Sequence, residues 1–198
     1  TNDNTPTVSG TAEANSVVGI LEAGVLVLTV NADANGAWST TLSTLADGSY
    51  DFTATATDAA GNTSVASTNV SIEVDTVAPE APEITSPVTG TITNDNTPTF
   101  AGTAEAGSSV EIFEGANSLG MVSADANGDW SFTSPVLADD LYMVTATATD
   151  DANNTSVASA SIEITIDTAV PVISSVTSTT PDGIYGIGQE IIVIVTWS

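Results

Sequence analysis

The sequence predicts an all-β chain made of tandem antiparallel β-sandwich domains arranged head to tail. First, the chain repeats itself: TNDNTPT at Thr1–Thr7 returns at Thr93–Thr99, a spacing of about 92 residues. Second, apolar and polar residues alternate with a period of two, as in Tyr142–Asp150, which is typical of half-buried strands. Third, turn sequences separate these runs roughly every 8–12 residues, as they do in β-sandwiches.

Other segments repeat with the same spacing and no gap. ADANG occurs at 32–36 and 124–128, and each copy is followed two residues later by a tryptophan, Trp38 or Trp130. TATATD occurs at 53–58 and 145–150, and NTSVAS at 62–67 and 154–159. A strict period of this length indicates an array of one repeated module.

The second repeat is complete, and its apolar alternation defines seven expected strands. From A to G these are Glu83–Ser86 (continuing past Pro87 towards Ile92), Pro98–Thr103, Ser109–Glu114, Leu119–Ser123, Trp130–Thr133, Leu141–Thr149 and Ser156–Ile166. Seven strands in about 92 residues is the size of an immunoglobulin-like domain. We therefore expect tandem immunoglobulin-like antiparallel β-sandwich domains.

A tyrosine near the start of strand F supports this fold. Tyr50 and Tyr142 each follow a tight turn, LADGSY or LADDLY. Immunoglobulin-like sandwiches place a tyrosine corner there, in which the hydroxyl bonds back to the turn backbone. The alternative is a tyrosine that only fills the core, and we favour the corner.

The two ends of the chain are incomplete as domains. Residues 1–79 lack a counterpart of strand A, residues 80–171 form the complete repeat, and residues 172–198 carry the first strands of a third domain. Those strands are expected at Val172–Ser178 and Glu190–Trp197, and two strands alone do not bury their apolar faces. The chain has no initiating Met and no visible signal peptide, so we expect an internal piece of a longer protein, with strand donation from another chain as the alternative.

The charge of the chain restricts its partners. It has 25 acidic residues and no Lys, Arg or His, for a formal net charge of −25. Such a surface does not pair with phosphates, so we expect no nucleic-acid binding, and no apolar run is long enough for membrane insertion. Acidity with few aromatics is also typical of disorder, but 41% hydrophobic residues and a mean hydropathy of +0.22 favour a packed core.

The composition also restricts chemistry. Without Cys, His, Lys or Arg the chain has no thiolate, imidazole base, Schiff-base amine or catalytic triad, and no disulfide or Lys–Asn cross-link. Paired carboxylates remain, but two small sandwiches with acids in their turns offer little sign of a catalytic cleft. We expect that the chain is not an enzyme.

The segments 75–115, 124–132 and 137–159 together resemble the bacterial Ig-like repeats of giant surface adhesins of the biofilm-associated type. The resemblance covers residues 1–171. It implies Ig-like sandwiches strung together as an extender, often rigidified by calcium, in proteins exported by type I secretion. It also implies a location outside the cell, on the surface of a Gram-negative bacterium.

Carboxylates are suited to calcium, which takes six to eight oxygen ligands. In an Ig-like sandwich the BC, DE and FG loops meet at the end where the preceding linker arrives. This topology brings together Glu105, Asp150 and Asp151 with Asp75 of the linker, and we expect an interdomain calcium held by Asp75, Glu105 and Asp150. The same mapping gives Glu13 and Asp58 in the first repeat and Asp167 at the next junction.

Other candidates have simpler explanations. Asp33, Asp125, Asp47 and Asp139 lie in common turn sequences, where Asp accepts bonds from its own backbone, so we favour turns over ligands. NDNTP is likewise expected to be a turn. Trp38 and Trp130 could stack on sugars, but one aromatic per repeat on an alternating strand is typical of a core.

These observations predict a structural extender of a large extracellular adhesin or surface fibre, stiffened by calcium at its domain junctions and serving cell adhesion or biofilm formation. Its partners would be neighbouring domains of the same chain. Two alternatives remain: a filament subunit assembled from copies of itself by strand exchange, and a carbohydrate-binding module. A binding site would be confined to one repeat, yet the loops AEAN/AEAG and DAAGN/DDANN are nearly interchangeable, which favours the extender.

Overall fold

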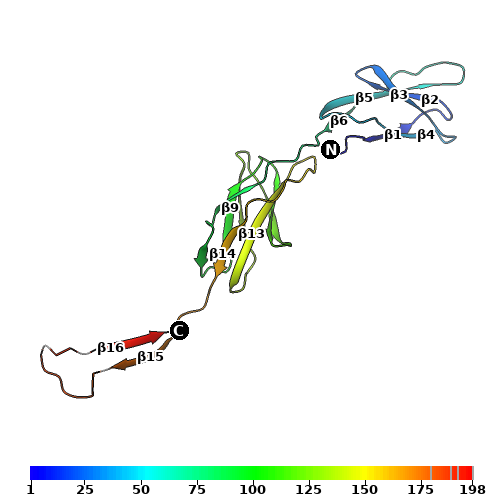
Figure 1. Cartoon of the computed structure of the whole chain (residues 1–198). Helices are drawn as coiled ribbons and strands as arrows, with labels where there is room; N and C mark the ends of the chain where they lie inside the picture. Colours follow the sequence, from blue (N-terminus) through cyan, green and yellow to red (C-terminus); the bar gives the residue numbers. More distant parts are fainter. Residues whose placement is uncertain (179, 188, 191, 198) are drawn as a thin grey trace.

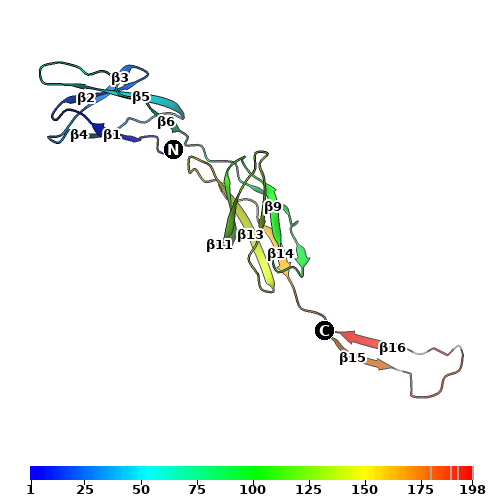
Figure 2. The same ribbon diagram turned by 180° about the vertical axis from the view of Figure 1, so that it is seen from behind.

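The computed structural model describes residues 1–178, 180–187, 189–190 and 192–197, and the elements of this described part are all strands (Figure 1). Most strand pairs are antiparallel, and they form two successive sandwiches followed by a hairpin. The fold class predicted from the sequence is therefore confirmed. Figures 1 and 2 show the second sandwich between the first sandwich and the hairpin.

The second module has two facing sheets. One sheet has the order β12-β9-β7 and the other the order β11-β10-β13-β14-β8. The strands are β7 (Glu83–Ser86), β8 (Thr91–Thr93), β9 (Thr99–Thr103), β10 (Ser109–Glu114), β11 (Asn117–Ser123), β12 (Asp129–Thr133), β13 (Asp140–Thr149) and β14 (Ile162–Ile166). Strands B to F of the sequence analysis lie within two residues of these bounds.

The strand labelled D in the sequence analysis occupies a different place from the D strand of a constant-type Ig domain. It corresponds to β11, which pairs with β10 in the five-stranded sheet, whereas a D strand lies in the opposite sheet with A, B and E. The reason is the connection between the two strands: only Gly115 and Ala116 separate Glu114 from Asn117. A two-residue loop forces the strands that it joins to pair with each other.

Strand A divides in two. The segment β7 pairs with β9 in one sheet, and after Pro87 the chain crosses to the other sheet, where β8 pairs with β14. The β8–β14 pair is parallel, so the expectation of purely antiparallel sheets needs this correction. Splitting strand A allows it to protect an edge of each sheet.

Strand G is shorter than predicted. Only Ile162–Ile166 form a strand, and the expected part from Ser156 to Ser161 runs irregularly beside β13. There the hydroxyls of Ser159 and Ser156 accept hydrogen bonds from the amides of Ala146 and Ala148 at 3.0 and 2.9 Å. Serine hydroxyls replace backbone carbonyls as acceptors, which satisfies the buried amides of β13 without a regular ladder.

The core of the second module lies between its sheets. Inward-facing side chains of β9, β10 and β13 are fully buried, among them Phe100, Val110, Ile112 and Val144. Trp130 is 3% exposed, which confirms the core interpretation for this residue and excludes it as a sugar platform.

The first module repeats this arrangement without strand A. Its sheets are β1-β4 and β3-β2-β5-β6. The strands are β1 (Thr7–Thr11), β2 (Val17–Glu22), β3 (Val25–Asn31), β4 (Ala37–Thr41), β5 (Gly48–Thr57) and β6 (Val70–Val74). Its core is correspondingly less closed: Val70 is 56% exposed, whereas its counterpart Ile162 is 7% exposed.

The tyrosine corner is confirmed in both modules. The Tyr50 hydroxyl donates to the carbonyl oxygen of Ala46 at 2.9 Å, and the Tyr142 hydroxyl donates to that of Ala138 at 3.1 Å. Each bond fixes the turn that leads into the longest strand of its module.

The chain after the second module forms the hairpin of β15 (Ile173–Ser178) and β16 (Val193–Trp197). This places strands inside the two expected runs, Val172–Ser178 and Glu190–Trp197, although Ile191 of the second run lies outside the described residues. The side chains of β15 are all exposed. Across the described part of the chain, no helix has the length and apolar character that crossing a bilayer requires.

Candidate functional site

The junction between the two modules carries a direct hydrogen-bond connection. The Asn154 side chain donates to the carbonyl oxygen of Asp75 at 2.9 Å. The backbone amide of Asn2 donates to Ala152 O at 3.1 Å, and its side-chain amide donates to Asn153 O at 2.9 Å. The loop between β13 and β14 of the second module therefore contacts both the start of the chain and the residue that follows β6.

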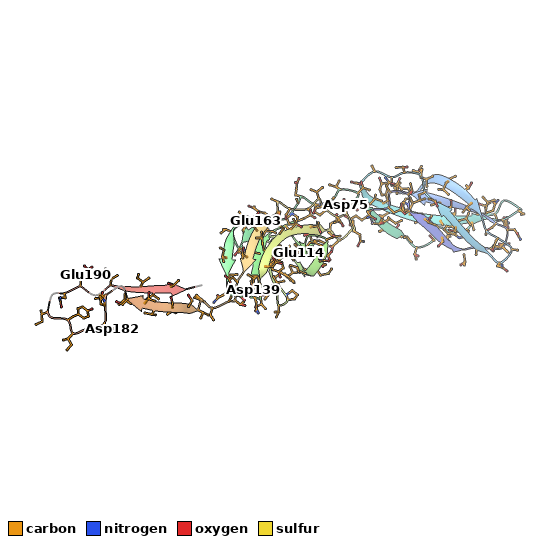
Figure 3. The ribbon with its side chains drawn as sticks, turned by 60° about the horizontal axis from the view of Figure 1, so that its bottom comes forward. Asp75, Glu114, Asp139, Glu163, Asp182 and Glu190 are labelled. Atoms are coloured by element: carbon orange, nitrogen blue, oxygen red, sulfur yellow. The ribbon has the colours of Figure 1, made fainter. Side chains whose placement is uncertain are left out.

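Beside these bonds lies a polar pocket of about 260 Å³. Five carboxylates from both modules line it, together with Thr1 and residues 106–108 and 152: Glu73, Asp75, Glu105, Asp150 and Asp151. Four of the five are residues that the sequence analysis places at this junction. Figure 3 shows Asp75 between the two modules.

Asp150 is held in place by the loop that follows it. Its Oδ1 accepts the backbone amide of Asn154 at 2.8 Å, and its Oδ2 accepts the Asn154 side-chain amide at 2.9 Å. Partial burial raises the pKa of Asp150, but the hydrogen bonds from Asn154 and from the amides of Ala152 and Asn153 outweigh it and lower the pKa below its usual value. The carboxylate is thus stabilised in its charged form.

The other lining carboxylates are less constrained. Asp75 Oδ1 accepts the amide of Val77 at 3.0 Å, and Glu105 and Asp151 are exposed. Within the described residues, no three acidic side chains already stand in the arrangement of a metal cage. The pocket supplies oxygen donors from both modules, and its exposed side chains would have to turn inward to share an ion.

The remaining predicted ligands lie elsewhere. Glu13 and Asp58 line a separate groove in the first module. Asp58 accepts both the backbone and the side-chain amide of Asn62, as Asp150 does with Asn154, and these bonds lower its pKa. Asp167 follows β14, and its carboxylate accepts the amide of Ala169 at 3.0 Å.

The turn interpretation of the ADANG loops is confirmed. Asp33 Oδ1 accepts the amides of Asn35 and Ala37, and Asp125 Oδ1 accepts those of Asn127 and Asp129, at 2.7–3.0 Å. These bonds lower the pKa of Asp125. The NDNTP turn is organised in the same way, because Asp95 Oδ1 accepts the amide and hydroxyl of Thr97.

Asp47 and Asp139 have a role beyond the turn. The backbone amide and hydroxyl of Thr76 donate to Asp47 Oδ1 at 3.1 and 2.9 Å, and those of Thr168 donate to Asp139 Oδ1 at 3.0 and 2.8 Å. Each pair ties the linker that leaves a module to the turn before its longest strand. Figure 3 shows Asp139 at the end of the second module opposite Asp75.

Sequence reasoning missed three features of the junction: Glu73, the bond from Asn154 and the Asp–Thr pairs. Glu73 could have been found from its outward position on β6, directly before the linker. The Asp–Thr pairs have a signal, because LAD and DT both recur with the repeat. No sequence signal predicts the Asn154 bond, because its acceptor is the backbone carbonyl of Asp75, the residue that follows the last strand of the first module.

Comparisons with known proteins identify the modules. A profile described as bacterial Ig-like domain matches residues 1–76 and 85–168. Exoglucanase B of Cellulomonas fimi is 33% identical over 128 residues, which are 60% of this chain and 11% of the enzyme. The chain thus spans about a tenth of the curated relative that it matches.

Two solved structures are similar. The fibronectin(III)-like modules of Clostridium thermocellum CbhA align with 81% of this chain and 84% of theirs, at 16% identity and a TM-score of 0.55, which supports the fold. The BSP domain of a biofilm-associated protein aligns with 86% of this chain and 29% of its own, at 25% identity and a TM-score of 0.36. Since the family profile matches most of the chain in two copies, the chain belongs to the bacterial Ig-like domain family.

Proposed function

We propose that this chain is an extender segment of a large extracellular adhesin or surface fibre, and that calcium stiffens the junction between its modules. The observation that carries the proposal is the junction pocket, in which five carboxylates from two modules surround about 260 Å³. The contacts of Asn154 and Asn2 support it further, because they connect the modules directly.

The donors of the pocket fit calcium. Hard cations take six to eight oxygen ligands from carboxylates, carbonyls and water, and every side-chain donor that lines the pocket is an oxygen. The chain has no Lys, Arg or His side chain to neutralise these acids, so a cation from solution would relieve their mutual repulsion. Asp75, Glu105, Asp150 and Asp151, with Glu73, would hold the ion.

The mechanical consequence follows from where the ligands lie. Asp75 and Glu73 belong to the end of the first module, and Glu105 and Asp150 belong to loops of the second. An ion shared between them would restrict bending at the junction and stabilise the modules by mass action. Without it, the clustered carboxylates would push the modules apart.

The proposed structural role outside the cell is supported by the amino-acid composition of the chain and by its resemblance to adhesin repeats. The acidic chain carries no Cys, His, Lys or Arg for catalysis, which supports a structural rather than an enzymatic role. The resemblance to adhesin repeats supports a place outside the cell, at a bacterial surface, in adhesion or biofilm formation. Neighbouring modules of the same chain are the proposed partners.

A second candidate function, in the degradation or binding of polysaccharide, is supported by one comparison. The curated relative that matches 128 residues of this chain is an exoglucanase, and the match covers 11% of that enzyme. The same module type could therefore space the domains of a polysaccharide-acting enzyme or contact the polysaccharide itself. Affinity electrophoresis in gels that contain soluble glucan distinguishes the two: retardation favours the carbohydrate role, and unchanged mobility favours the extender.

Isothermal titration with calcium tests the junction site. We expect saturable binding that Glu105→Gln weakens, because the variant removes one carboxylate from the pocket lining. Glu105 is exposed, so the substitution should leave the fold intact. Glu13→Gln is the matched control, because Glu13 holds the same place in the first module, away from the junction. Equal calcium affinity in the two variants would contradict the proposed site.

A further inference from the structure

The first module presents an apolar strand at one edge of its larger sheet. In the order β3-β2-β5-β6 the strand β3 lies at an edge, and none of its residues, Val25–Asn31, carries a charge. Four apolar side chains of β3 and the neighbouring β2 are between 43% and 66% exposed: Val17, Val25, Leu26 and Val27. We call the surface formed by β3 and these side chains the β3 edge.

The β3 edge does not depend on strand A. In the complete second module the sheet order is β11-β10-β13-β14-β8, so strand A contributes β8 at one end of the sheet. The counterpart of β3 is β11, at the other end, and within the described residues β11 pairs only with β10. A strand A in front of the first module would therefore leave the β3 edge open.

The fold does not require apolar residues at these positions. The second module forms the same hairpin with polar residues in place of Val17, Val25 and Leu26. At the repeat spacing these counterparts are Ser109, Asn117 and Ser118. Since apolar side chains are exposed at this place in only one of two closely similar modules, they are typical of an interaction surface.

The outer face beside β3 is also free of charge. Gly19 lies on this face of β2, and a Cβ built there would be 2.9 Å from Leu26 Cδ1, so the Leu26 side chain lies over Gly19. The second module has Glu111 at the position of Gly19. The glycine thus allows an apolar side chain to cover a place where the other repeat carries a carboxylate.

The backbone of β3 is suited to pairing beyond its bulge at Val27. The amide of Ala32 donates to the carbonyl oxygen of Ser16, which leads into β2. Because backbone groups alternate in direction along a strand, those of Thr29 and Asn31 point away from β2. They form a short row of donors and acceptors for a further strand.

The corresponding edge of the second module is less suited to pairing. Gly120 takes the place of Leu28 there and has a φ of 147°, outside the range of an extended L residue. Leu28 is not among the residues with positive φ. A regular edge is therefore found on β3 and not on β11.

The charge of the chain indicates what pairs with this edge. A basic partner would be attracted to the acidic surfaces and not to a strand without charge. A second copy carries the same formal charge of −25, so two copies repel each other least where both surfaces lack acids. Apolar edge strands are also ready templates for pairing with their own kind.

We propose that β3 pairs antiparallel with β3 of a second copy across a two-fold axis, with Thr29 facing Thr29 of the second copy. Val27 then faces Asn31, and the two four-stranded sheets become one continuous sheet. The contact uses the same surface on both copies, so it closes at a dimer and joins the chains side by side. It goes beyond the extender role and does not depend on calcium. One strand pair is a small interface, so the dimer is weak.

A single engineered cysteine tests this register, because the chain has no native Cys. In the full chain with Thr29→Cys the two facing Cα atoms would be about 5.5 Å apart, within the range of a disulfide. Oxidation is carried out at about 0.15 M salt, which screens the acids, and with EGTA, which prevents calcium from bridging two copies. We expect a covalent dimer on a denaturing gel.

The matched control is Met121→Cys, since Met121 is the exposed counterpart of Thr29 on β11. Chance collisions would oxidise both variants alike, whereas a formed strand pair should give at least about tenfold more dimer from Thr29→Cys, because a disulfide needs its specific geometry. Equal yields from the two variants overturn the proposal.

Sedimentation velocity over a concentration series tests the contact without a cross-link. We expect the wild type to show a monomer–dimer equilibrium that Thr29→Glu shifts to monomer, because like charges would then face each other across the strands. Met121→Glu adds the same charge elsewhere and should sediment as the wild type does. An equal effect of the two variants, or a wild type that stays monomeric, overturns the proposal. If a labelled peptide of residues 22–33 binds a monomeric wild type, the edge accepts strands but not a second copy, and the proposal is wrong.

Discussion

The side-chain amide of Asn154 donates a hydrogen bond to the carbonyl oxygen of Asp75 at 2.9 Å, and this bond joins a loop of the second module to the residue that follows the last strand of the first. The same amide group donates to Asp150 Oδ2 at 2.9 Å. One buried side chain therefore fixes both the candidate ligand Asp150 and the linker that approaches it.

Replacing Asn154 by Ala should destabilise the second module and loosen the junction. Removing a buried donor to a charged acceptor costs about 1.5–3 kcal/mol. Urea unfolding monitored by Trp130 fluorescence, in a background where the other tryptophans are Phe, measures the stability of this module. Asn62→Ala is the control, because Asn62 holds Asp58 in the same way but is exposed and contacts no other module. Equal losses in the two variants would refute the junction role of Asn154.

Replacing Ser159 by Ala should leave the buried amide of Ala146 without an acceptor. The expected loss is about 1–3 kcal/mol, the usual effect of an unsatisfied buried group. Ser67→Ala removes the equivalent acceptor from the amide of Ala54 in the first module, where the serine is exposed and water can replace it. Denaturant midpoints of the two variants should therefore differ. Similar midpoints would mean that the hydroxyl bonds of the irregular segment do not contribute to stability.

Replacing Tyr142 by Phe tests the tyrosine corner. The variant keeps the ring and loses only the bond to the Ala138 carbonyl, so we expect a loss of about 0.5–1.5 kcal/mol. Thermal unfolding of this variant beside Tyr50→Phe, which loses the bond to Ala46, measures the effect in each module. An unchanged melting temperature in both would show that the ring, and not the hydroxyl, holds the turn.

The lowered pKa of Asp150 predicts how stability depends on pH. Its pKa is lower in the folded chain than the value of about 3.9 expected when unfolded, so its contribution is fully present above about pH 4. That contribution is lost as the pH falls through the lowered native value. Urea midpoints between about pH 2 and pH 6 should show a steeper acid loss for the second module in the wild type than in Asp150→Asn. Identical slopes would contradict this.

Most strands could be predicted from the sequence because their environment follows a simple pattern. Val110 and Ile112 alternate with polar residues and are fully buried, so the period of two locates β10. The irregular segment 156–161 does not follow this alternation, because Ser156 and Ser159 are buried as hydrogen-bond acceptors and not as apolar side chains. Periodicity does not distinguish them from strand residues.

The sequence predicted the candidate site only in part, because topology places the loops but does not orient their side chains. Topology brings the loops with Glu105 and Asp150 to the end where the linker with Asp75 arrives, and the structure places all three around one pocket. Topology does not say how carboxylate oxygens are oriented, nor that Asn154 bridges the modules through a backbone acceptor. Those details depend on contacts between residues 79 positions apart in the chain.

Small-angle X-ray scattering of residues 1–198 tests the central claim most directly, recorded in calcium at about 1 mM, within the range of extracellular modules, and again after chelation with EGTA. We predict an elongated particle in calcium whose scattering indicates a more flexible junction after chelation, with a lower melting temperature. Glu105→Gln should resemble the chelated state at the same calcium concentration, and Glu13→Gln should resemble the wild type. A shape and melting temperature that do not change on chelation would contradict calcium stiffening and leave these carboxylates as turn residues and solvated surface.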